Sequence, residues 1–383
     1  MNLPRASFLT ILAGPTLPVP LPLPLTQRVK SVTVTESDDN RSAFSIVFDA
    51  GRGGQAGMLD APFGATSPVT SFSRVVLLLT LRAFPQVLFD GVVTESHMDA
   101  ASGQAAATMT VTGEDVGNLL DREERDIEHP AMADYLAVLK ILAPYAAKGL
   151  LPMAFPPQTM DQPLPMDRIP TQHGTDLAHI TALAERNGHV TYVIPGPLPG
   201  TSSVYWGPPI RVGLPQPALA VDLGADTNVT QVAFRTEATT PTQVSGAVTD
   251  RRSGDPSSVT APTPARAPLS SAPLATTHSG DVRQRRLRGA RSDSVGAQAQ
   301  AQAQVDRSSD AVIAEGRADG ARYGSVLRPR ALVGMRGAGH DHDGIWYVRK
   351  IQHELAPGSY AFGFTLAREG HGSTVPVVPR AAA

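Results

Sequence analysis

The sequence predicts a mainly β protein with α+β insertions: two tube-like antiparallel β-barrel domains related by internal duplication, with a small helix-containing region between them. Segments in which apolar and polar residues alternate, as in half-buried strands, occur towards both ends of the chain, and helical spacing occurs between them. A strand, a turn and an alternating return strand occur twice, at 88–112 and at 345–366. Glycine and proline number 34 each, and their combined fraction of the 383 residues is below the fraction typical of disordered chains.

Residues 1–115 are expected to form the first barrel, with an N-terminal proline-rich arm. Apolar patterns predict its strands at 29–36, 43–49, 75–81, 87–95 and 108–112. An apolar segment at 8–14 follows Arg5 as in a signal peptide, but prolines follow it at once and no small-x-small cleavage site is present. We therefore expect a first strand there, continued by a polyproline II arm.

Residues 116–215 form the predicted middle region, because the apolar spacing changes here to that of a helix. One helix is expected over 132–145. A second is expected over 175–186, with Thr175 as its N-cap and an Asn-Gly pair as its end. A hairpin completes the region, with strands at 189–194 and 203–206.

Residues 216–370 are expected to form the second barrel, and 371–383 a tail. Its strands are predicted at 229–236, 242–250, 332–335, 345–353 and 359–366. Alternating alanine and glutamine favour a helix beginning near 297. Residues 251–294 are rich in Ser, Pro, Ala and Arg and almost lack large apolar side chains, so they are interpreted as a flexible, exposed insert.

Two features of the repeated strand–turn–strand units bear on packing. His97 and His353 occupy matching places near the ends of the first strands, which favours a structural role, such as a strand-end hydrogen bond, over catalysis. In the second unit, Trp346 alternates with Tyr347 along the strand, so the two rings point to opposite faces. One of these faces must be buried, and the pattern leaves open which one.

The composition of the 383-residue chain limits its function. The net charge is −2, so no global field directs the protein to nucleic acid or to an anionic membrane. The chain has no cysteine and therefore no disulfide, thiol catalysis or cysteine-ligated metal. Aromatic residues make up 5%, which is low for a surface that stacks on sugars or bases. No apolar stretch is long enough to span a bilayer.

The metal candidates are four consecutive residues, His340, Asp341, His342 and Asp343. They lie between Gly339 and Gly344, where a hairpin tip is expected, and alternate residues of an extended chain point in opposite directions. A solvated turn is therefore the preferred interpretation, with a bound metal as the alternative. No cofactor is expected.

Two charged runs are candidate sites. The basic run Arg283–Arg291 could contact phosphates, but it lacks interleaved aromatic residues, which favours a solvated or partner-facing loop. The run Asp121–Asp126 offers the paired carboxylates that glycosidases need, but it also contains arginines, which favours a charged helix surface. The sequence contains neither a Gly-x-Ser-x-Gly element nor a glycine-rich phosphate loop, so no catalytic residue is assigned and the protein is not expected to be an enzyme.

Three segments, in this order, resemble phage late control D proteins. The first runs from Val87-Leu88-Phe89-Asp90-Gly91 through Val111-Thr112-Gly113-Glu114-Asp115 to Arg122, the second from Gly174-Thr175-Asp176 to Asn187-Gly188, and the third from Leu327-Arg328-Pro329-Arg330 through Trp346-Tyr347-Val348 to Arg368. That family forms the baseplate hub of contractile tails and is related to the first part of type VI secretion spike proteins.

The resemblance implies a homotrimer whose six barrels form a pseudo-hexameric ring, adapting the hexameric inner tube to the trimeric spike. It implies as partners the inner tube protein, a separate spike protein because no needle domain follows Arg368, and baseplate wedge proteins, with no nucleic acid and no membrane insertion. The chain would be synthesised in the cytoplasm and then assembled into a virion or an injection system, which the resemblance does not distinguish. The alternatives are a tail-associated cell-wall hydrolase and a carbohydrate- or nucleic-acid-binding β-module.

Overall fold

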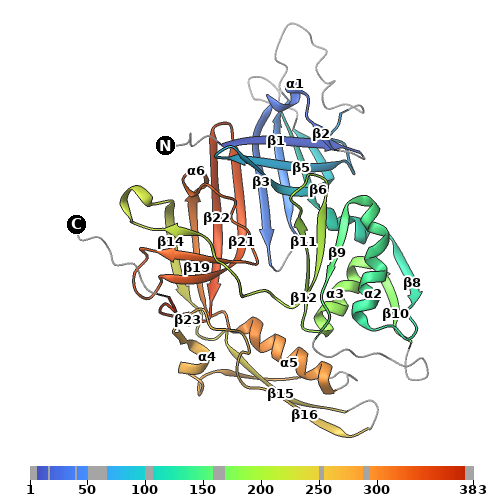
Figure 1. Cartoon of the computed structure of the whole chain (residues 1–383), viewed down its shortest axis with the longest axis vertical. Helices are drawn as coiled ribbons and strands as arrows, with labels where there is room; N and C mark the ends of the chain where they lie inside the picture. The colour runs from blue at the N-terminus through green and yellow to red at the C-terminus, as the bar shows by residue number, and fades with distance from the viewer. Residues whose placement is uncertain are drawn as a thin grey trace.

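One large antiparallel sheet dominates the computed structural model (Figure 1), which describes residues 7–15, 18–38, 41–50, 67–99, 107–157, 169–249, 254–287 and 294–375. Of the described residues 49% lie in strands and 19% in helices, so the fold is mainly β, as the sequence predicts. Within the described residues the large sheet has 13 strands: β1 (Ser7–Gly14), β2 (Val19–Pro20), β3 (Val29–Ser37), β4 (Ala43–Asp49), β5 (Arg74–Leu81), β6 (Phe84–Asp99), β7 (Thr108–Asp115), β13 (Gln216–Ala220), β14 (Val229–Thr236), β19 (Val312–Asp319), β20 (Leu332–Arg336), β21 (Gly344–Ala356) and β22 (Ser359–Arg368).

The strand order joins the two ends of the chain. It reads β14-β19-β22-β21-β3-β4-β7-β6-β5-β1-β2, with β20 beside β21 and β13 beside β20. The expectation of two closed barrels is therefore wrong for the part of the chain described, where a single open sheet runs through both halves. The reason lies in strand length. The five residues of β20 pair only with the first part of β21, and β3 pairs with the rest, from Lys350 to Leu355.

The two halves also share one hydrophobic core. Val32 and Val34 from β3 pack in the same cluster as Ile351 from β21 and Phe362 from β22, and none of these four side chains is exposed. Trp346 lies on this core face and is fully buried. Tyr347 is buried on the opposite face, against a smaller cluster, so both faces of this strand are covered.

The middle region packs around its own core beside the large sheet (Figure 1). Thr175 caps α3 (Asp176–Arg186) as predicted, its hydroxyl accepting a hydrogen bond of 3.2 Å from the Ala178 amide. The earlier helix, α2 (Asp134–Leu142), is shorter than expected and continues as a 3-10 helix that contains Pro144. The predicted hairpin is present as β11 (Val190–Pro195) and β12 (Ser202–Gly207), with β9 (Leu150–Ala154) beside β12, and a second small sheet pairs β8 (Glu124–Glu128) with β10 (Thr171–Thr175).

The segment interpreted as a flexible insert, 251–294, contains strands, a one-turn helix and part of a packed core. β16 (Pro256–Ala261) and β18 (Arg283–Arg286) flank β15 (Thr242–Thr249), and α5 (Ser294–Ser308) packs on this sheet. Its core consists of valines and alanines: Val244, Val248, Val259, Ala261, Ala297, Ala301 and Val305. A composition test for large apolar residues misses such a core, and the loop interpretation is wrong for 256–261, 272–277 and 283–286.

The insert also contacts the segment that follows β22. The Glu369 carboxylate accepts hydrogen bonds from the Leu269 amide, at 2.5 Å, and from the Ser270 amide, at 2.6 Å. β17 (Ala272–Pro273), followed by α4 (Leu274–Thr277), pairs with β23 (Gly370–His371) at the start of the expected tail. Residues 376–383 of that tail lie outside the described part of the chain.

The expected polyproline II arm is not a simple extension. β2 is followed by α1 (Leu23–Thr26), a one-turn helix with a proline within its first turn, and the Leu25 side chain is buried in the main core. A second one-turn helix, α6 (Gly320–Tyr323), follows β19. Among the described residues, no helix has the length and apolar character needed to cross a membrane.

Candidate assembly interface

Two sets of five strands in the large sheet are arranged alike. In the first half the order is β5-β6-β7-β4-β3, and in the second half it is β20-β21-β22-β19-β14. All neighbouring strands in both sets are antiparallel. The strands also occur in the same chain order in both halves. We call these sets the first and second five-strand units.

Irregularities in strand pairing fall at equivalent places in the two units. The pairing of β3 with β4 shifts after Val29, and that of β14 with β19 shifts after Val229. The pairing of β6 with β7 shifts after Val93, and that of β21 with β22 after Val348. A bulge fixes the register of the strands around it, so these four valines align the units residue by residue.

This alignment corrects the matching of the two histidines. Counting from the bulges, His97 corresponds to Gln352, and His353 corresponds to Met98. The two histidines lie on opposite faces, since a shift of one residue along a strand exchanges faces. The His97 side chain is 66% exposed and lies 3.0 Å from Asp99, whereas the His353 side chain is fully buried.

The contact between the two units inside the chain is the pairing of β3 with β21, which we call the internal joint. It places Glu36 beside Ile351, and Val34 beside His353. The Glu36 carboxylate lies 3.5 Å from Nε2 of His353 and 3.4 Å from Nη1 of Arg328. Arg328 also donates to the main-chain carbonyl of Leu88 at 2.6 Å, so the cluster extends from the joint to β6.

The buried groups of the internal joint form a charge pair beside a neutral imidazole. Burial lowers the pKa of His353 below its usual value, although Glu36 acts in the opposite direction. Burial alone would raise the pKa of Glu36, but Arg328 and His353 outweigh it and the pKa lies below its usual value. Glu36 is therefore ionised opposite Arg328. Sequence reasoning missed this cluster, because these two residues are 292 positions apart and no local pattern relates them.

Each five-strand unit leaves one edge unpaired within the described chain. β14 ends the sheet and is bonded only to β19. In β6, pairing with β5 stops at Val92, so the segment from Thr94 to Asp99 is bonded only to β7. All six residues of that segment are exposed, and Met98 is 47% exposed. Unpaired strand edges offer main-chain donors and acceptors to another strand.

The metal candidates form the turn between β20 and β21. His340 and Asp341 are exposed, whereas Asp343 is buried and accepts a hydrogen bond of 2.7 Å from the Ala338 amide. The His342 ring stacks on Phe234 with 4.0 Å between ring centroids. The four side chains therefore have different surroundings. Over the described ranges, no three His, Asp or Glu side chains gather so that they could hold a metal ion.

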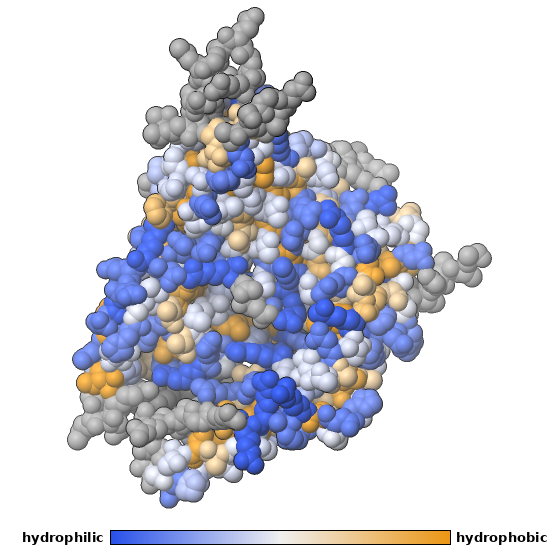
Figure 2. All heavy atoms as spheres, turned by 180° about the vertical axis from the view of Figure 1, so that it is seen from behind, coloured by the Kyte–Doolittle hydropathy of each residue, from blue (hydrophilic) through white to orange (hydrophobic). Residues whose placement is uncertain are grey.

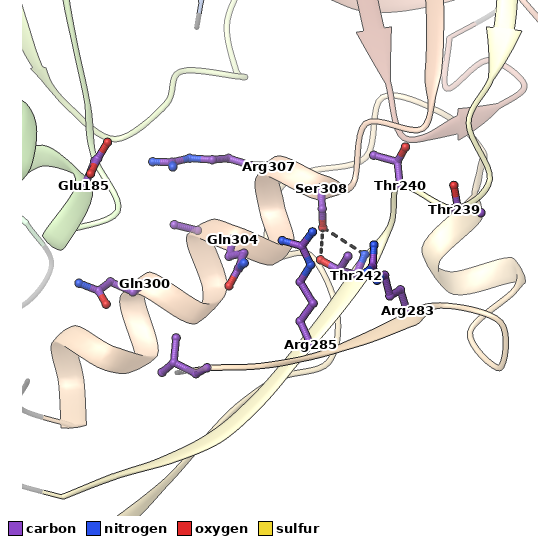
Figure 3. A pocket seen from close by; sticks show the side chains of 12 residues that line it. Glu185, Thr239, Thr240, Thr242, Arg283, Arg285, Gln300, Gln304, Arg307 and Ser308 are labelled. Carbon is purple, nitrogen blue, oxygen red and sulfur yellow. Dashed lines mark hydrogen bonds between the residues drawn. The ribbon is translucent and has the colours of Figure 1, made fainter. Parts of the chain in front are cut away.

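The basic run contributes to a groove between the insert and α3 (Figure 3), with a volume of about 600 Å³. Arg283 and Arg285 enter it from β18, Arg307 extends from α5, and Glu185 faces them from α3. The expectation of a loop is wrong for the first four residues of the run, which form β18; residues 288–291 lie outside the described chain. The three arginines against one carboxylate give the groove a positive field.

The acidic run Asp121–Asp126 lies at the end of a 3-10 helix and the start of β8, so the expectation of a charged helix surface is wrong. Three of its four carboxylates lie beside a basic side chain. Asp121 pairs with Arg41, Glu123 lies 2.6 Å from Arg125, and Asp126 contacts His173 at 2.7 Å.

One broad face of the molecule is mainly hydrophilic. Figure 2 shows that hydrophilic side chains predominate there and that hydrophobic ones are scattered over it. A surface of this kind favours contacts built from polar groups and strand edges over contacts built from one extended apolar patch.

No protein-family model and no curated protein matches the sequence. Solved structures match over nearly the whole chain. The tail protein of Neisseria meningitidis MC58 superposes with a TM-score of 0.65 at 11% identity, covering 95% of this chain and 97% of that chain. The 43 kDa tail protein of prophage MuSo2 from Shewanella oneidensis gives 0.63 at 13% identity, covering 95% and 99%.

A third match links the fold to secretion. An Escherichia coli component of the type VI secretion system, described as similar in structure to the bacteriophage T4 tail proteins gp27 and gp5, gives a TM-score of 0.52 at 14% identity, covering 92% of this chain and 77% of that chain. At these identities the likeness shows the fold alone. The chain therefore has the fold of phage tail proteins, a fold that this type VI secretion component also contains.

Proposed function

We propose that this protein is the baseplate hub of a contractile tail or of a phage-derived contractile injection system. In this role a homotrimer adapts the hexameric inner tube to the trimeric spike. The observation that carries the proposal is the pair of five-strand units with matching bulges. Three chains bring six such units around one axis, so a threefold assembly presents six similar surfaces to a sixfold ring.

The two units are the products of an internal duplication, and each contributes a tube-like segment to the assembled ring. The division of the chain into 1–115, 116–215 and 216–370 stays a prediction, in which the first and last parts carry the units. The middle region and the folded insert then decorate the ring on its outside. The likeness to tail proteins supports this proposal, because it extends over 95% of the chain and is not confined to one domain.

The partners in this proposal are the inner tube protein on one side, a separate spike protein on the other, and baseplate wedge proteins around the ring. The protein performs no catalysis and binds neither nucleic acid nor membrane. After synthesis in the cytoplasm it becomes part of an assembled particle. A cell-wall hydrolase is the competing function. It needs two carboxylates facing each other across a cleft, whereas three of the acidic residues in the run Asp121–Asp126 pair with basic side chains.

The test is the stoichiometry of the assembled particle. The full chain is produced together with its neighbouring tail gene products, and the hub is examined by mass measurement and by a particle map. We expect three copies of this chain between the tube and the spike. Six copies at the hub would contradict the adapter role. Release of peptidoglycan fragments by the purified chain would instead support the hydrolase.

A further inference from the structure

We propose that the free edge of β14 in one chain pairs with the Thr94–Asp99 segment of β6 in the next chain, antiparallel, and thereby copies the internal joint between chains. The partner is a second copy of this protein. The inference rests on the proposed function only for the number of copies in the ring. The pairing itself is argued from strand order, register and exposure within one chain.

The chain contains the template for this contact. Inside it, β3 lies at the end of the first five-strand unit and pairs with the part of β21 that β20 leaves uncovered. In the other unit β14 occupies the position of β3, and the Thr94–Asp99 segment occupies the position of the uncovered part of β21. Both of these edges are unpaired in the described chain. One chain therefore carries both sides of a second joint but cannot close it alone.

The bulges give the register of the intermolecular pairing. Val34 corresponds to Phe234, because the first strands of the units align from Val29 and Val229. His353 corresponds to Met98 by the same counting from the later bulges. Since His353 pairs with Val34 inside the chain, Met98 should face Phe234 of the next chain. The expected pairs are Ser96 with Thr236, His97 with Arg235, Met98 with Phe234, and Asp99 with Ala233.

The side chains at these positions suit one another. Met98 is a large apolar residue with 47% exposure at an otherwise polar edge, and Phe234 is half-buried beside it in the expected pair. A thioether against an aromatic ring is a favourable contact. On the other face, Arg235, whose side chain is 57% exposed, would lie diagonally between Glu95 and Asp99. The hydroxyls of Ser96 and Thr236 would face each other at the position where the internal joint has Ile351 and Glu36.

The differences between the two joints prevent mispairing. β3 carries Glu36, which the internal joint neutralises with Arg328. If β3 entered the site on β6 of another chain, this carboxylate would face Ser96 and would be buried without that arginine. Burying an uncompensated charge is costly. β14 carries Thr236 at the same position and meets no such cost, so each edge has one suitable partner.

The geometry is head-to-tail, because the two edges of one chain are different surfaces. Such contacts close into a ring when the rotation between neighbours allows it, and otherwise grow into a filament. The internal joint sets the rotation between units inside the chain. A ring in which both joints share that geometry has one repeated angle throughout.

The chain has no cysteine, so introduced cysteines report on the pairing without background. The first test variant combines His97→Cys with Arg235→Cys, and the second combines Met98→Cys with Phe234→Cys. Neighbouring pairs in an antiparallel ladder alternate between close and wide spacing, so one of the two variants has the spacing that a disulfide needs. The control combines His97→Cys with Ala233→Cys, which lies on the same face two residues out of register.

Each full-length variant is co-expressed with the neighbouring tail gene products, oxidised, and run denatured without reductant. We expect linked species up to the mass of three chains from at least one test variant and monomers from the control. Mixing the two single variants, His97→Cys and Arg235→Cys, should link chains in pairs only if positions 97 and 235 form a closely spaced pair. A second mixture, of Met98→Cys and Phe234→Cys, tests positions 98 and 234 in the same way. Reductant should restore monomers in every case.

The outcomes separate this inference from the proposed function. If neither test variant links, the edge pairing is wrong, and the native mass of the same sample then decides whether the trimer survives. If linked species continue beyond three chains, the edges pair as stated but the ring does not close at three, which contradicts the hub proposal. If the control links as well as the test variants, the register is wrong.

Discussion

Replacing Trp346 by alanine should damage both folding and assembly. The side chain is fully buried in the core that the two five-strand units share. Its Nε1–H donates a hydrogen bond of 2.9 Å to the main-chain carbonyl of His342. The guanidinium carbon of Arg368 lies 4.2 Å from the centre of the ring, and Phe234 packs at 5.9 Å between ring centroids.

The expected loss follows from these contacts. Truncating a buried tryptophan to alanine costs about 3–5 kcal/mol, because the lost burial and the cavity add. Arg368 is buried, and burial lowers its pKa to about 10, so its guanidinium lies in a desolvated site. The substitution also removes the cation–π contact between this guanidinium and the indole ring, which is worth roughly 1–2 kcal/mol in such a site. The sum, about 4–7 kcal/mol, is a large part of the 5–15 kcal/mol by which domains are usually stable.

The assay is denaturant and thermal unfolding, together with a mass measurement under the same conditions. Trp346→Phe keeps a ring and loses the indole N–H, so it should fall between wild type and the alanine variant. Leu214→Ala serves as the control, because Leu214 is 96% exposed and its truncation should leave stability unchanged. An alanine variant at position 346 that melts and assembles like wild type would refute the placement of this strand face in the core.

Three further predictions concern other parts of the chain. Deleting 254–287 should give insoluble or early-melting protein, measured by solubility and thermal unfolding, because it removes Val259 and Ala261 from the valine–alanine core under α5. Burial lowers the pKa of His189 from 6.5 to about 4, so as the pH falls this side chain is protonated in the unfolded protein before it is protonated in the folded protein. The free energy of unfolding should therefore decrease as the pH drops from 6.5 to about 4. His189→Phe should make that decrease shallower in denaturant titrations. Gly91→Ala should cost about 1–3 kcal/mol in unfolding experiments, since its Cβ would lie 2.3 Å from the Glu114 carbonyl oxygen, whereas Gly363→Ala, with 3.8 Å to its nearest atom, should be tolerated.

Local signals in the sequence were sufficient for most individual elements. The strand at 43–49 is present with the predicted bounds, because Phe44, Ile46 and Phe48 are buried and alternate with half-buried positions. The helix over 176–186 also begins where a local signal places it, because the Thr175 hydroxyl caps it and an apolar stripe follows. Such patterns depend on neighbours within a few residues and do not need the rest of the fold.

The arrangement of those elements in space was harder to predict. The internal joint brings β3 next to β21, and the Glu36–Arg328 pair beside it spans 292 residues, so no window of sequence contains both partners. The fold of the insert is hard to predict for a different reason. Its core uses Val259 and alanines of α5, and small apolar residues spaced among serines and prolines resemble a polar loop in composition. For the interface, the repeated pattern indicated that equivalent strands exist, but the register came from the bulges.

The folded insert interrupts one unit and not the other. Five residues, 38–42, separate β3 from β4 in the sequence, whereas the chain between the equivalent strands β14 and β19 includes the subdomain of β15, β16, β18 and α5. In the proposed trimer, six units share one strand order, and every second unit alone bears this appendage. A protein that binds the strand edges would thus contact six similar sites, whereas a protein that binds the outer rim would contact three. A single chain would in this way give one assembly two symmetries, each available to a different neighbour.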